Sequence, residues 1–471
     1  MGDTERLRAG REGVERLLAG EALEQVLDPA DPVAWTALDA GVRALQWWQY
    51  EDGGSLGARL RARPETALCH ADGRVRQLAL AAAQADRRLL PLAVIRCADW
   101  AEPVRVRARR ILRAALTADP ADTLRRLTPL VLRLGGRDHG SWARSLFEES
   151  LAAAPDGLLA ELRRGPDAQT RRLAGRITLD RGLFDAAELA RQATAETDPA
   201  LQRLWTEAAL AALAADGPDD RVVDTLLGAR SARVRAAGVT ALRRAGRAAE
   251  GAAHLGDRSA AVRSCARWLV RQHGGDPRGH YLVELARHPR PGILAGLAEC
   301  GERQDADVLR ELLAHDEGAV RAAAVAGLRA LDAARVADVR PLLDDPSPAV
   351  AREAVRALRP WADRLAAGAL AERLAADRPA HTRRAAFKLL RAQGGMPRLR
   401  AAVGLLTDPE PRLRGLAVAD VRGWDWQHSL RVEGAGLGEL AELLQRSAPA
   451  FDDYELALRR SRMGLGSDLG E

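Results

Sequence analysis

The sequence predicts an all-α protein in which about twelve helical hairpins stack on one another as a solenoid. Three observations support this fold class. Alanine, leucine and arginine dominate the chain, aromatic residues make up only 4% of it, and clusters of β-branched residues bounded by turns are scarce. A short pattern recurs about every thirty residues along the chain. Its apolar positions are four residues apart, which is the spacing of one helix face.

The recurring pattern starts with Asp in a turn, often followed by Pro or Ser, and continues with an apolar anchor, Arg, a small residue and a second apolar residue. Its clearest copies span residues 257–270, 316–328, 345–358, 377–390 and 408–421. The copies around Trp142, Leu201 and Ile293 are weak, and Val33 marks a candidate first copy. The full set of anchors is Val33, Val75, Val104, Trp142, Thr170, Leu201, Val234, Val262, Ile293, Val320, Val350, Thr382 and Leu413.

Each copy predicts the second helix of a hairpin. The residue four positions after the anchor is almost always small, as in Ala108, Gly238 and Ala324, so that two helix axes can approach closely. A larger apolar residue follows at eight positions after the anchor in many copies. The anchor and the residues four and eight positions after it, called plus four and plus eight, are therefore predicted to form one buried stripe. Shorter first helices are predicted upstream, as at 308–315, 339–345 and 370–377.

Charged residues at the turns are predicted to stabilise the stack. An Asp five residues before the anchor is placed to cap the second helix, with Pro inside or just before the first turn. An Arg directly follows many anchors. We expect turn aspartates and these arginines to form a ladder of charge-assisted hydrogen bonds between adjacent units, pairing Asp257 with Arg263, Asp377 with Arg383 and Asp408 with Arg414.

The Asp turn, the Val-Arg step, the small residue at plus four and the short period together resemble HEAT repeats, particularly the short bilin-lyase-type variety. The resemblance covers roughly residues 60–424. It implies a right-handed superhelix of the armadillo and HEAT type, with second helices on the concave side. We therefore expect an N-terminal helical cap or degenerate repeat at 1–60, a repeat array at 61–424, a C-terminal helical cap at 425–460 and a flexible tail at 461–471. HEAT repeats serve scaffolds, chaperones, transport factors and a few enzymes, so the resemblance leaves activity open.

No catalytic constellation stands out in the sequence. The nine histidines are scattered without an HExxH motif or a His-Glu pair, whereas HEAT-repeat di-iron hydroxylases use His-Glu pairs as metal ligands. The Gly-Gly pairs lack the context of a phosphate loop, and the four cysteines are far apart without CxxC spacing. We therefore expect no enzymatic activity, no metal and no cofactor. No apolar run is long enough for a membrane span, which favours a cytoplasmic location without a membrane partner.

A row of arginines recurs nine residues after the anchors, outside the buried stripe. With Trp268, which falls beside it, this row forms the candidate concave binding surface: Arg113, Arg243, Arg271, Arg329, Arg359, Arg391 and Arg422. Arg110, Arg352, Arg356, Arg384 and Lys388 broaden the row. One interpretation is a groove for an acidic protein segment or a nucleic-acid backbone. The other is that cations recur near helix C-termini because they complement the helix dipole there.

The ten tryptophans are a second unusual feature, because Phe and Tyr are rare. Trp47, Trp48 and Tyr50 cluster near one end of the array, and Trp424 with Trp426 near the other. Terminal units must cover an exposed core face, so these clusters are interpreted as caps, with anchoring of a partner as the alternative.

The leading hypothesis for function is a non-catalytic scaffold that binds a protein partner, with an acidic segment suited to the arginines, in a bacterial complex. A second is nucleic-acid binding that resembles HEAT-repeat alkylpurine DNA glycosylases, although their catalytic residues find no match here. A third is a bilin-lyase-like enzyme, which only the repeat type supports. The charge of +6, from 71 basic and 65 acidic residues, favours none of them, and the oligomeric state stays open.

Overall fold

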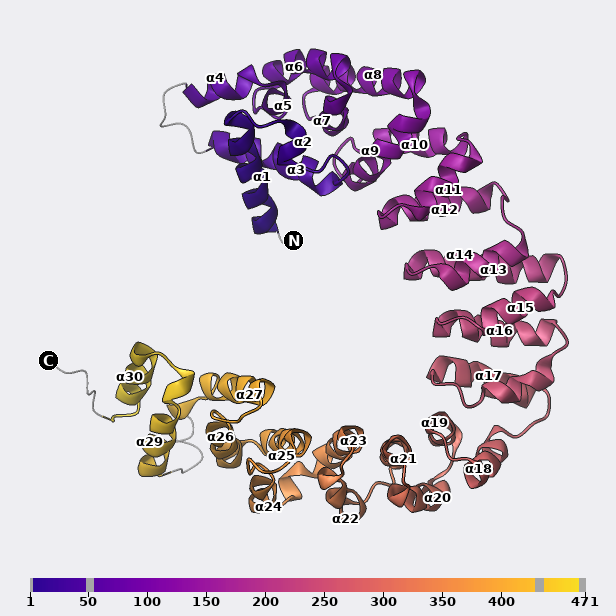
Figure 1. Cartoon of the computed structure of the whole chain (residues 1–471), viewed down its shortest axis with the longest axis vertical. Helices are drawn as coiled ribbons and strands as arrows, with labels where there is room; N and C mark the ends of the chain where they lie inside the picture. The colour runs from indigo at the N-terminus through magenta and orange to yellow at the C-terminus, as the bar shows by residue number, and fades with distance from the viewer. Residues whose placement is uncertain (1–2, 48–54, 428–435, 466–471) are drawn as a thin grey trace. The chain divides into compact units, whose positions relative to one another are not determined.

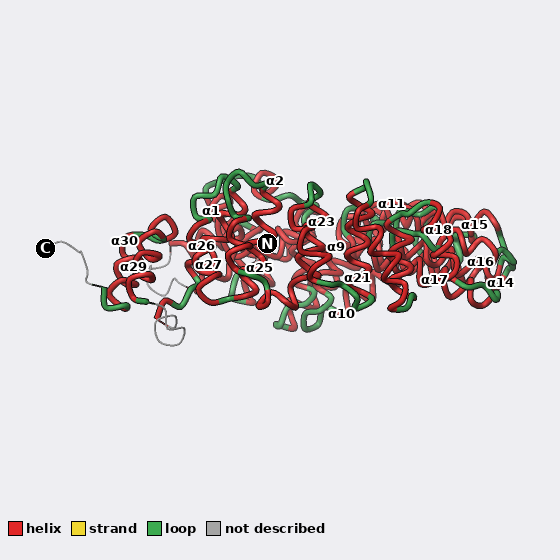
Figure 2. Tube along the Cα trace, turned by 90° about the horizontal axis from the view of Figure 1, so that it is seen from below, coloured by secondary structure: helices red, strands yellow, loops and turns green. Residues whose placement is uncertain are grey.

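The computed structural model describes residues 3–47, 55–427 and 436–465 of the 471-residue chain. Every regular element within these residues is a helix, and Figure 2 accordingly shows only helices and loops along the described trace. The fold class is therefore confirmed as all-α. None of the described helices has the length and apolar character that a membrane span requires.

The chain divides into two compact units, residues 1–226 and 227–471, and Figure 1 labels the helices of both. Unit 1 contains α1 (Asp3–Leu18), α2 (Leu23–Val26), α3 (Pro32–Trp47), α4 (Ser55–Ala62), α5 (Pro64–Ala67), α6 (Gly73–Ala85), η1 (Arg87–Leu89), α7 (Leu90–Arg96), α8 (Glu102–Ala118), α9 (Pro120–Leu134), α10 (Ser141–Ala152), α11 (Asp156–Arg164), α12 (Ala168–Asp180), α13 (Ala186–Ala195) and α14 (Pro199–Ala215). α15 (Asp220–Leu227) ends at the boundary.

Unit 2 contains α16 (Ala232–Arg244), η2 (Ala248–His254), α17 (Ala260–Gln272), α18 (Pro277–Arg287), α19 (Pro291–Cys300), η3 (Arg303–Asp305), α20 (Ala306–Glu311), η4 (Leu312–Ala314), α21 (Gly318–Ala330), α22 (Val336–Val339), η5 (Arg340–Asp344), α23 (Pro348–Leu358), η6 (Arg359–Arg364), α24 (Ala367–Glu372), α25 (Ala380–Gln393), α26 (Gly395–Gly404), α27 (Pro411–Arg422), α29 (Leu437–Arg446), η7 (Ala448–Ala450) and α30 (Asp453–Arg462). The clearest predicted second helices correspond to α17, α21, α23, α25 and α27.

Contacts run in sequence from one helix pair to the next. Within the pairs, α11 packs on α12, α13 on α14, α18 on α19, α20 on α21 and α24 on α25. Second helices also contact one another, in the series α17, α19, α21, α23 and α25 of unit 2 (Figure 1). Unit 2 thus has one layer of second helices and a layer of shorter first elements.

Burial follows the predicted stripe. In α8 the anchor Val104, Ala108 at plus four and Leu112 at plus eight are all buried, and the same three positions are buried in α16, α21, α23, α25 and α27. The small residue at plus four places the helix axes close together, so that a short apolar stripe suffices for each unit.

The helices α6 and α14 of unit 1 depart from the pattern. Val75 in α6 is only half-buried, whereas Leu80 and Ala83 lie in the core. In α14 the position four after Leu201 holds Trp205, a large residue that is 1% exposed. Gly175 of α12 makes room for it, because a Cβ at Gly175 would lie 2.6 Å from Leu201 Cδ1 and 3.1 Å from the Trp205 ring.

The first elements are shorter and tighter than the sequence predicts. The segment predicted as a helix at 308–315 becomes α20 followed by the 3-10 turn η4, and that at 339–345 becomes α22 with the 3-10 helix η5. The segment predicted at 370–377 ends as an α-helix at Glu372. In η5, Pro341 lacks the N–H that an α-helical bond would need, which favours the tighter turn.

The tryptophans expected at the ends of the array are partly described. Trp48 and Tyr50 lie outside the described residues, as do the side chain of Trp47, His428 and the tail residues 466–471. Trp426 is 4% exposed within the core that also contains Leu440 and Leu443 of α29, and Trp424 packs against this core. Their packing agrees with a capping role, and the burial of Trp426 removes it as a docking point.

Candidate interaction surface

The arginine row in unit 2 lies at the ends of second helices. Arg243, Arg271, Arg329, Arg391 and Arg422 stand in the last turns of α16, α17, α21, α25 and α27, and Arg359 is the C-cap residue of α23. The last carbonyls of a helix lack intrahelical partners, and a cation there gains about 0.3–1 kcal/mol. Helix-end electrostatics therefore explains the position of these residues, but not whether their side chains are free.

Four arginines of the row are free for a partner, and we call them the open arginines. Arg243, Arg271, Arg329 and Arg359 are exposed and make no hydrogen bond or ion pair with the part of the chain that the structure describes. Second helices that carry them touch: α16 contacts α17, and α21 contacts α23. Each contacting pair of helices therefore carries two of these arginines, on helices whose axes are roughly 8–10 Å apart when packed.

The last two arginines of the row are bound within the protein. Arg391 Nε lies 2.7 Å from an oxygen of Asp420, a carboxylate that is 3% exposed. Arg422 Nε donates to the carbonyl of Ala450 at 2.5 Å. These two contacts tie α25 to α27 and α27 to η7. Arg391 and Arg422 therefore contribute to the packing of unit 2. Because their side chains are bonded within the protein, their place in the candidate surface is not supported.

Trp268 extends the open arginines with an aromatic face. It lies on α17 and is 41% exposed, and the guanidinium carbon of Arg243 on α16 is 5.6 Å from its ring centroid. Trp268 is three residues before Arg271, which places both side chains on one helix face. An exposed aromatic ring flanked by guanidinium groups offers stacking and charge in the same place.

The row is interrupted at α19. The position nine residues after Ile293 is Glu302, which pairs with Arg278 at 3.9 Å. The open arginines thus form two pairs rather than a continuous line. Of the residues that broaden the row in unit 2, Arg352 and Lys388 are exposed and have no hydrogen bond or ion pair within the described residues.

The other broadening residues meet carboxylates. Arg356 forms an ion pair with Glu353 on its own helix, and Arg384 lies 3.5 Å from Glu410. Negative charge is therefore interleaved with the cations around α23 and α25.

In unit 1 the row is represented by Arg113, which stands five residues before the end of α8 and so outside its last turn. Its guanidinium carbon is 5.1 Å from the ring centroid of Trp142, and that of Arg109 is 4.7 Å from the same ring. Arg110 is exposed. Trp142 is thus a half-buried residue held by two arginines.

The ladder of arginines and aspartates exists, but with different partners from those predicted. After four of the anchors, the arginine binds the turn aspartate of the next unit through two hydrogen bonds, an arrangement we call the inter-unit clamp. The clamps are Arg76 with Asp99, Arg235 with Asp257, Arg321 with Asp345, and Arg383 with Asp408, at 2.7–2.9 Å. Adjacent units are joined as expected.

The predicted pairs within one unit are wrong. Arg263 donates to the backbone carbonyl of Asp257 and its side chain binds Glu299, while Arg414 donates to the backbone carbonyl of Asp408. Arg383 donates to the carbonyls of Ala376 and Arg378 rather than to the Asp377 side chain. The reason is geometric. The side chain of an arginine one residue past the anchor points across the contact between two helices, while its terminal N–H groups reach back to the turn of its own unit.

The turn aspartates also act differently from helix caps. Asp345 Oδ1 accepts the N–H of Ser347 at 2.8 Å, and Ser347 is the N-cap residue of α23. Asp257 does the same for Ser259 before α17. Oδ1 of the carboxylate thus fixes the turn two residues before the N-cap, and both carboxylate oxygens accept from the clamp arginine; neither accepts from the first helical turn.

The clamps lower the pKa of their carboxyl groups. Burial alone raises the pKa of Asp408, but the hydrogen bonds from Arg383 and from the backbone outweigh it and leave the pKa below its usual value. A variant of the clamp joins α12 to α14, where Arg172 binds Asp198 at 2.6 and 2.9 Å. The Arg172 hydrogen bonds lower the pKa of Asp198 to about 2.

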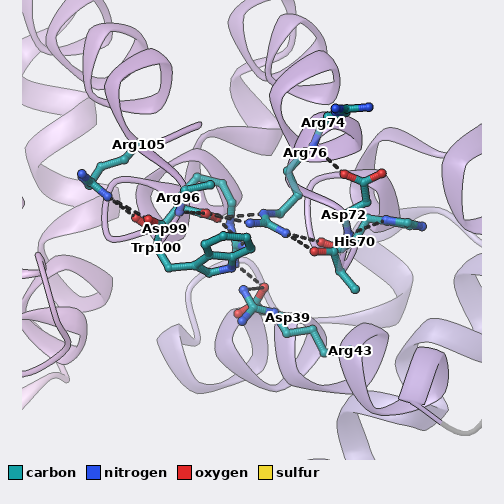
Figure 3. Close-up of polar contacts among 12 residues, drawn as sticks. Asp39, Arg43, His70, Asp72, Arg74, Arg76, Arg96, Asp99, Trp100 and Arg105 are labelled. Carbon is teal, nitrogen blue, oxygen red and sulfur yellow. Dashed lines mark hydrogen bonds and ion pairs between the residues drawn. The ribbon is translucent and has the colours of Figure 1, made fainter. Parts of the chain in front are cut away.

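The most buried charges of unit 1 form one network around the first clamp (Figure 3). Asp99 accepts from Arg76 and, at 3.2 Å, from Arg96, and Arg96 also pairs with Asp39 of α3. These four side chains are at most 5% exposed. Two guanidinium groups face two carboxylates, so the buried charges balance and connect α3, α6 and α7. We interpret this network as structural.

Histidine replaces the turn aspartate in two units. His70 Nδ1 accepts the N–H of Asp72 at 3.0 Å, and His315 Nδ1 accepts the N–H of Glu317 at 3.1 Å. Both acceptors hold the turn as the aspartates do. The unit before His315 has Leu294 where the clamp arginine would be, so His315 stands where no clamp arginine needs a carboxylate.

Metal-binding side chains do not cluster in the described part of the chain. Among these residues, no group of three or more His, Cys, Asp or Glu side chains is placed to hold a metal ion. The four cysteines are free thiols, and burial raises the pKa of Cys97 to about 12. Such a thiol stays protonated at neutral pH and is a poor nucleophile.

Comparisons with known proteins give no family. No protein-family model matches the chain, and no curated protein sequence matches it. Among solved structures, the chain is similar to an engineered protein known from a crystal structure, at 17% sequence identity over 90% of this chain and 97% of that chain, with a TM-score of 0.24. This low score adds nothing to the description of the fold.

Proposed function

We propose that this protein is a non-catalytic scaffold of HEAT-like repeats that binds an acidic segment of a protein partner along the second helices of unit 2. The repeat array is proposed to form a right-handed solenoid, with residues 1–60 and 425–460 as helical caps. The recurring Asp turn, the clamp arginine and the small residue at plus four support the HEAT-like assignment, because each has a defined packing role in the structure.

One observation carries the functional part of the proposal. The open arginines Arg243, Arg271, Arg329 and Arg359 are exposed and make no hydrogen bond or ion pair with the described part of the chain, whereas the clamp arginines are fully bonded. An arginine needed only for packing is expected to find a partner within the fold. Free guanidinium groups with Trp268 beside them suit carboxylates, which accept two parallel hydrogen bonds from arginine.

The distribution of charge favours an acidic peptide over a nucleic acid. A nucleic-acid backbone presents closely and evenly spaced phosphates, and its binding depends on neutralising many of them. Here Glu302 interrupts the row, and Glu353 and Glu410 lie among the cations. A flexible acidic segment can place its carboxylates at two separated pairs of arginines, whereas a regular phosphate backbone would meet the interleaved carboxylates.

The test compares binding of a fluorescein-labelled poly-glutamate peptide and of a labelled DNA duplex, each over a series of salt concentrations. The variant replaces Arg271, Arg329 and Arg359 together with glutamine. Each lost exposed ion pair is worth about 0.2–1 kcal/mol, so the loss of three should lower poly-glutamate affinity about 3- to 150-fold.

A matched control changes the same charge elsewhere. Arg303, Arg335 and Arg340 are exposed arginines of the first elements of unit 2, and they likewise lack ion pairs within the described residues. Their triple glutamine variant should keep wild-type affinity. Equal loss in both triple variants would show that only net charge matters and would refute the proposed surface. Tighter binding of DNA than of poly-glutamate, lost in the first variant alone, would replace the acidic partner with a nucleic acid.

A further inference from the structure

A groove in unit 1 lies between the second helices α6 and α8 and has a volume of about 1090 Å³. Four alanines are among the residues that line it, Ala83 of α6 and Ala114, Ala115 and Ala118 of α8. Leu90 and Ile111 are both buried beneath it and form an apolar floor. Small side chains on two packed helices leave a valley that larger residues would fill, which is why the groove forms here.

The two walls of the groove carry different polar groups. Gln77 and Gln84 lie on α6 seven residues apart, which is two helical turns, so both amides line the same wall. Arg107 and Arg110 line the α8 wall, and Arg87 stands at one end. The amides of Gln77 and Gln84 and the guanidinium group of Arg110 have no hydrogen-bond partner within the described residues.

The charges of the groove select an acidic ligand. Three arginines and one carboxylate, that of Glu102, line it. Arg107 is engaged by the backbone carbonyl of Gln77 at 2.9 Å, and Arg87 makes only long contacts of 3.4 Å to Asp119 and Asp122. Arg110 is therefore the guanidinium group most available to a carboxylate.

We propose that the α6–α8 groove binds an extended peptide segment of a partner protein that carries one acidic and one aliphatic side chain. A side-chain amide donates and accepts hydrogen bonds, so Gln77 and Gln84 match the N–H and C=O groups of an extended backbone at two points. The acidic side chain meets Arg110, and the aliphatic one packs on Leu90 and Ile111.

The length of the groove sets the length of the segment. α8 has 17 residues. At 1.5 Å per residue it is roughly 25 Å long, which an extended strand covers with about seven residues. This site is separate from the open arginines, and it does not depend on the function proposed for unit 2.

The experiment selects short random peptides displayed on phage against the immobilised full-length protein. Enriched clones are then tested for binding to Ala114→Trp, which fills the groove from an exposed position, and to Arg110→Glu. Ala419→Trp, at an exposed alanine on α27 of unit 2, is the control for added aromatic surface. Far-ultraviolet circular dichroism checks that each variant keeps its helices.

We expect enriched peptides that combine Asp or Glu with an aliphatic residue and lose at least about tenfold in affinity for Ala114→Trp and Arg110→Glu, a loss of about 1.4 kcal/mol. The same clones should bind Ala419→Trp and the Arg271, Arg329 and Arg359 triple variant like the wild type. Failure to enrich any clone, enrichment of clones without acidic residues, or undiminished binding to Ala114→Trp would overturn the proposal. Clones lost only in the triple variant would assign peptide binding to unit 2 instead.

Discussion

Replacing Asp408 with alanine removes the carboxylate half of the clamp between α25 and the turn before α27. Arg383 and Asp408 are 4% and 5% exposed, and two hydrogen bonds of 2.8 and 2.9 Å join them. Loss of one partner leaves the other charge buried and unpaired, which typically costs about 3–5 kcal/mol. Arg383 keeps its bonds to the carbonyls of Ala376 and Arg378, so we expect the lower end, a loss of about 3 kcal/mol in unfolding free energy.

The assay is urea denaturation followed by circular dichroism, with hydrogen exchange to locate the loss at residues 395–422. Asp377→Ala is the matched control, because Asp377 occupies the same turn position but is exposed and has no hydrogen bond or ion pair within the described residues. Its effect should stay within about 0.5 kcal/mol. The double variant Arg383→Met/Asp408→Leu should lose less than Asp408→Ala, since it leaves no unpaired charge. Equal effects of Asp408→Ala and Asp377→Ala would refute the clamp as a source of stability.

Two further predictions concern other joints of the stack. The folded-state pKa of Asp198, about 2, lies below the unfolded value of 3.8, so its bond to Arg172 stabilises the fold above about pH 4 and is lost as the pH falls toward 2. Urea midpoints measured across this pH range should therefore fall more steeply for the wild type than for Asp198→Asn. Parallel slopes of the two proteins would contradict the assignment. Gly296→Ala places a Cβ 2.3 Å from the Tyr281 ring and should cost about 1–3 kcal/mol by overpacking, whereas Gly404→Ala meets nothing within 4 Å and should not destabilise the protein in the same thermal scan.

The buried stripe was predictable because it depends only on helical period and residue size. Val104, Ala108 and Leu112 occupy the core as their spacing indicates. Trp205 breaks the rule of a small residue at plus four, and its tolerance depends on Gly175 of the preceding unit. A single copy of the pattern carries no information about its neighbour, so this compensation is visible only when two adjacent copies are compared.

The partners of the clamp were missed for a related reason. Asp257 and Arg263 are six residues apart in one copy, which suggested a local pair, yet Asp257 binds Arg235 of the copy before. A signal was present in the sequence, because arginine after one anchor and aspartate in the next turn occur together at 76 and 99, 235 and 257, 321 and 345, and 383 and 408.

The candidate surface was predictable only as a set of positions. The spacing places Arg359 and Arg391 equivalently at helix ends. Asp420 of a later helix binds Arg391, whereas no described carboxylate binds Arg359. Helix position follows from sequence period, whereas the availability of a guanidinium group depends on carboxylates far along the chain. The α6–α8 groove was missed entirely, because alanine, which creates it, is the ordinary residue of these helices.

The division of each clamp between two copies also sets how this chain can be shortened, lengthened or recombined. If a segment of the chain is excised by cuts at two turns, its last copy keeps its clamp arginine. The segment loses the aspartate of the following turn, which binds that arginine. A copy that contains Arg235 or Arg321 can therefore be followed only by a copy whose turn supplies a carboxylate. The copy that contains Leu294 has no clamp arginine, so a copy whose turn carries histidine can follow it. Neighbouring copies are thus matched at their boundaries, and their order along the chain is not interchangeable.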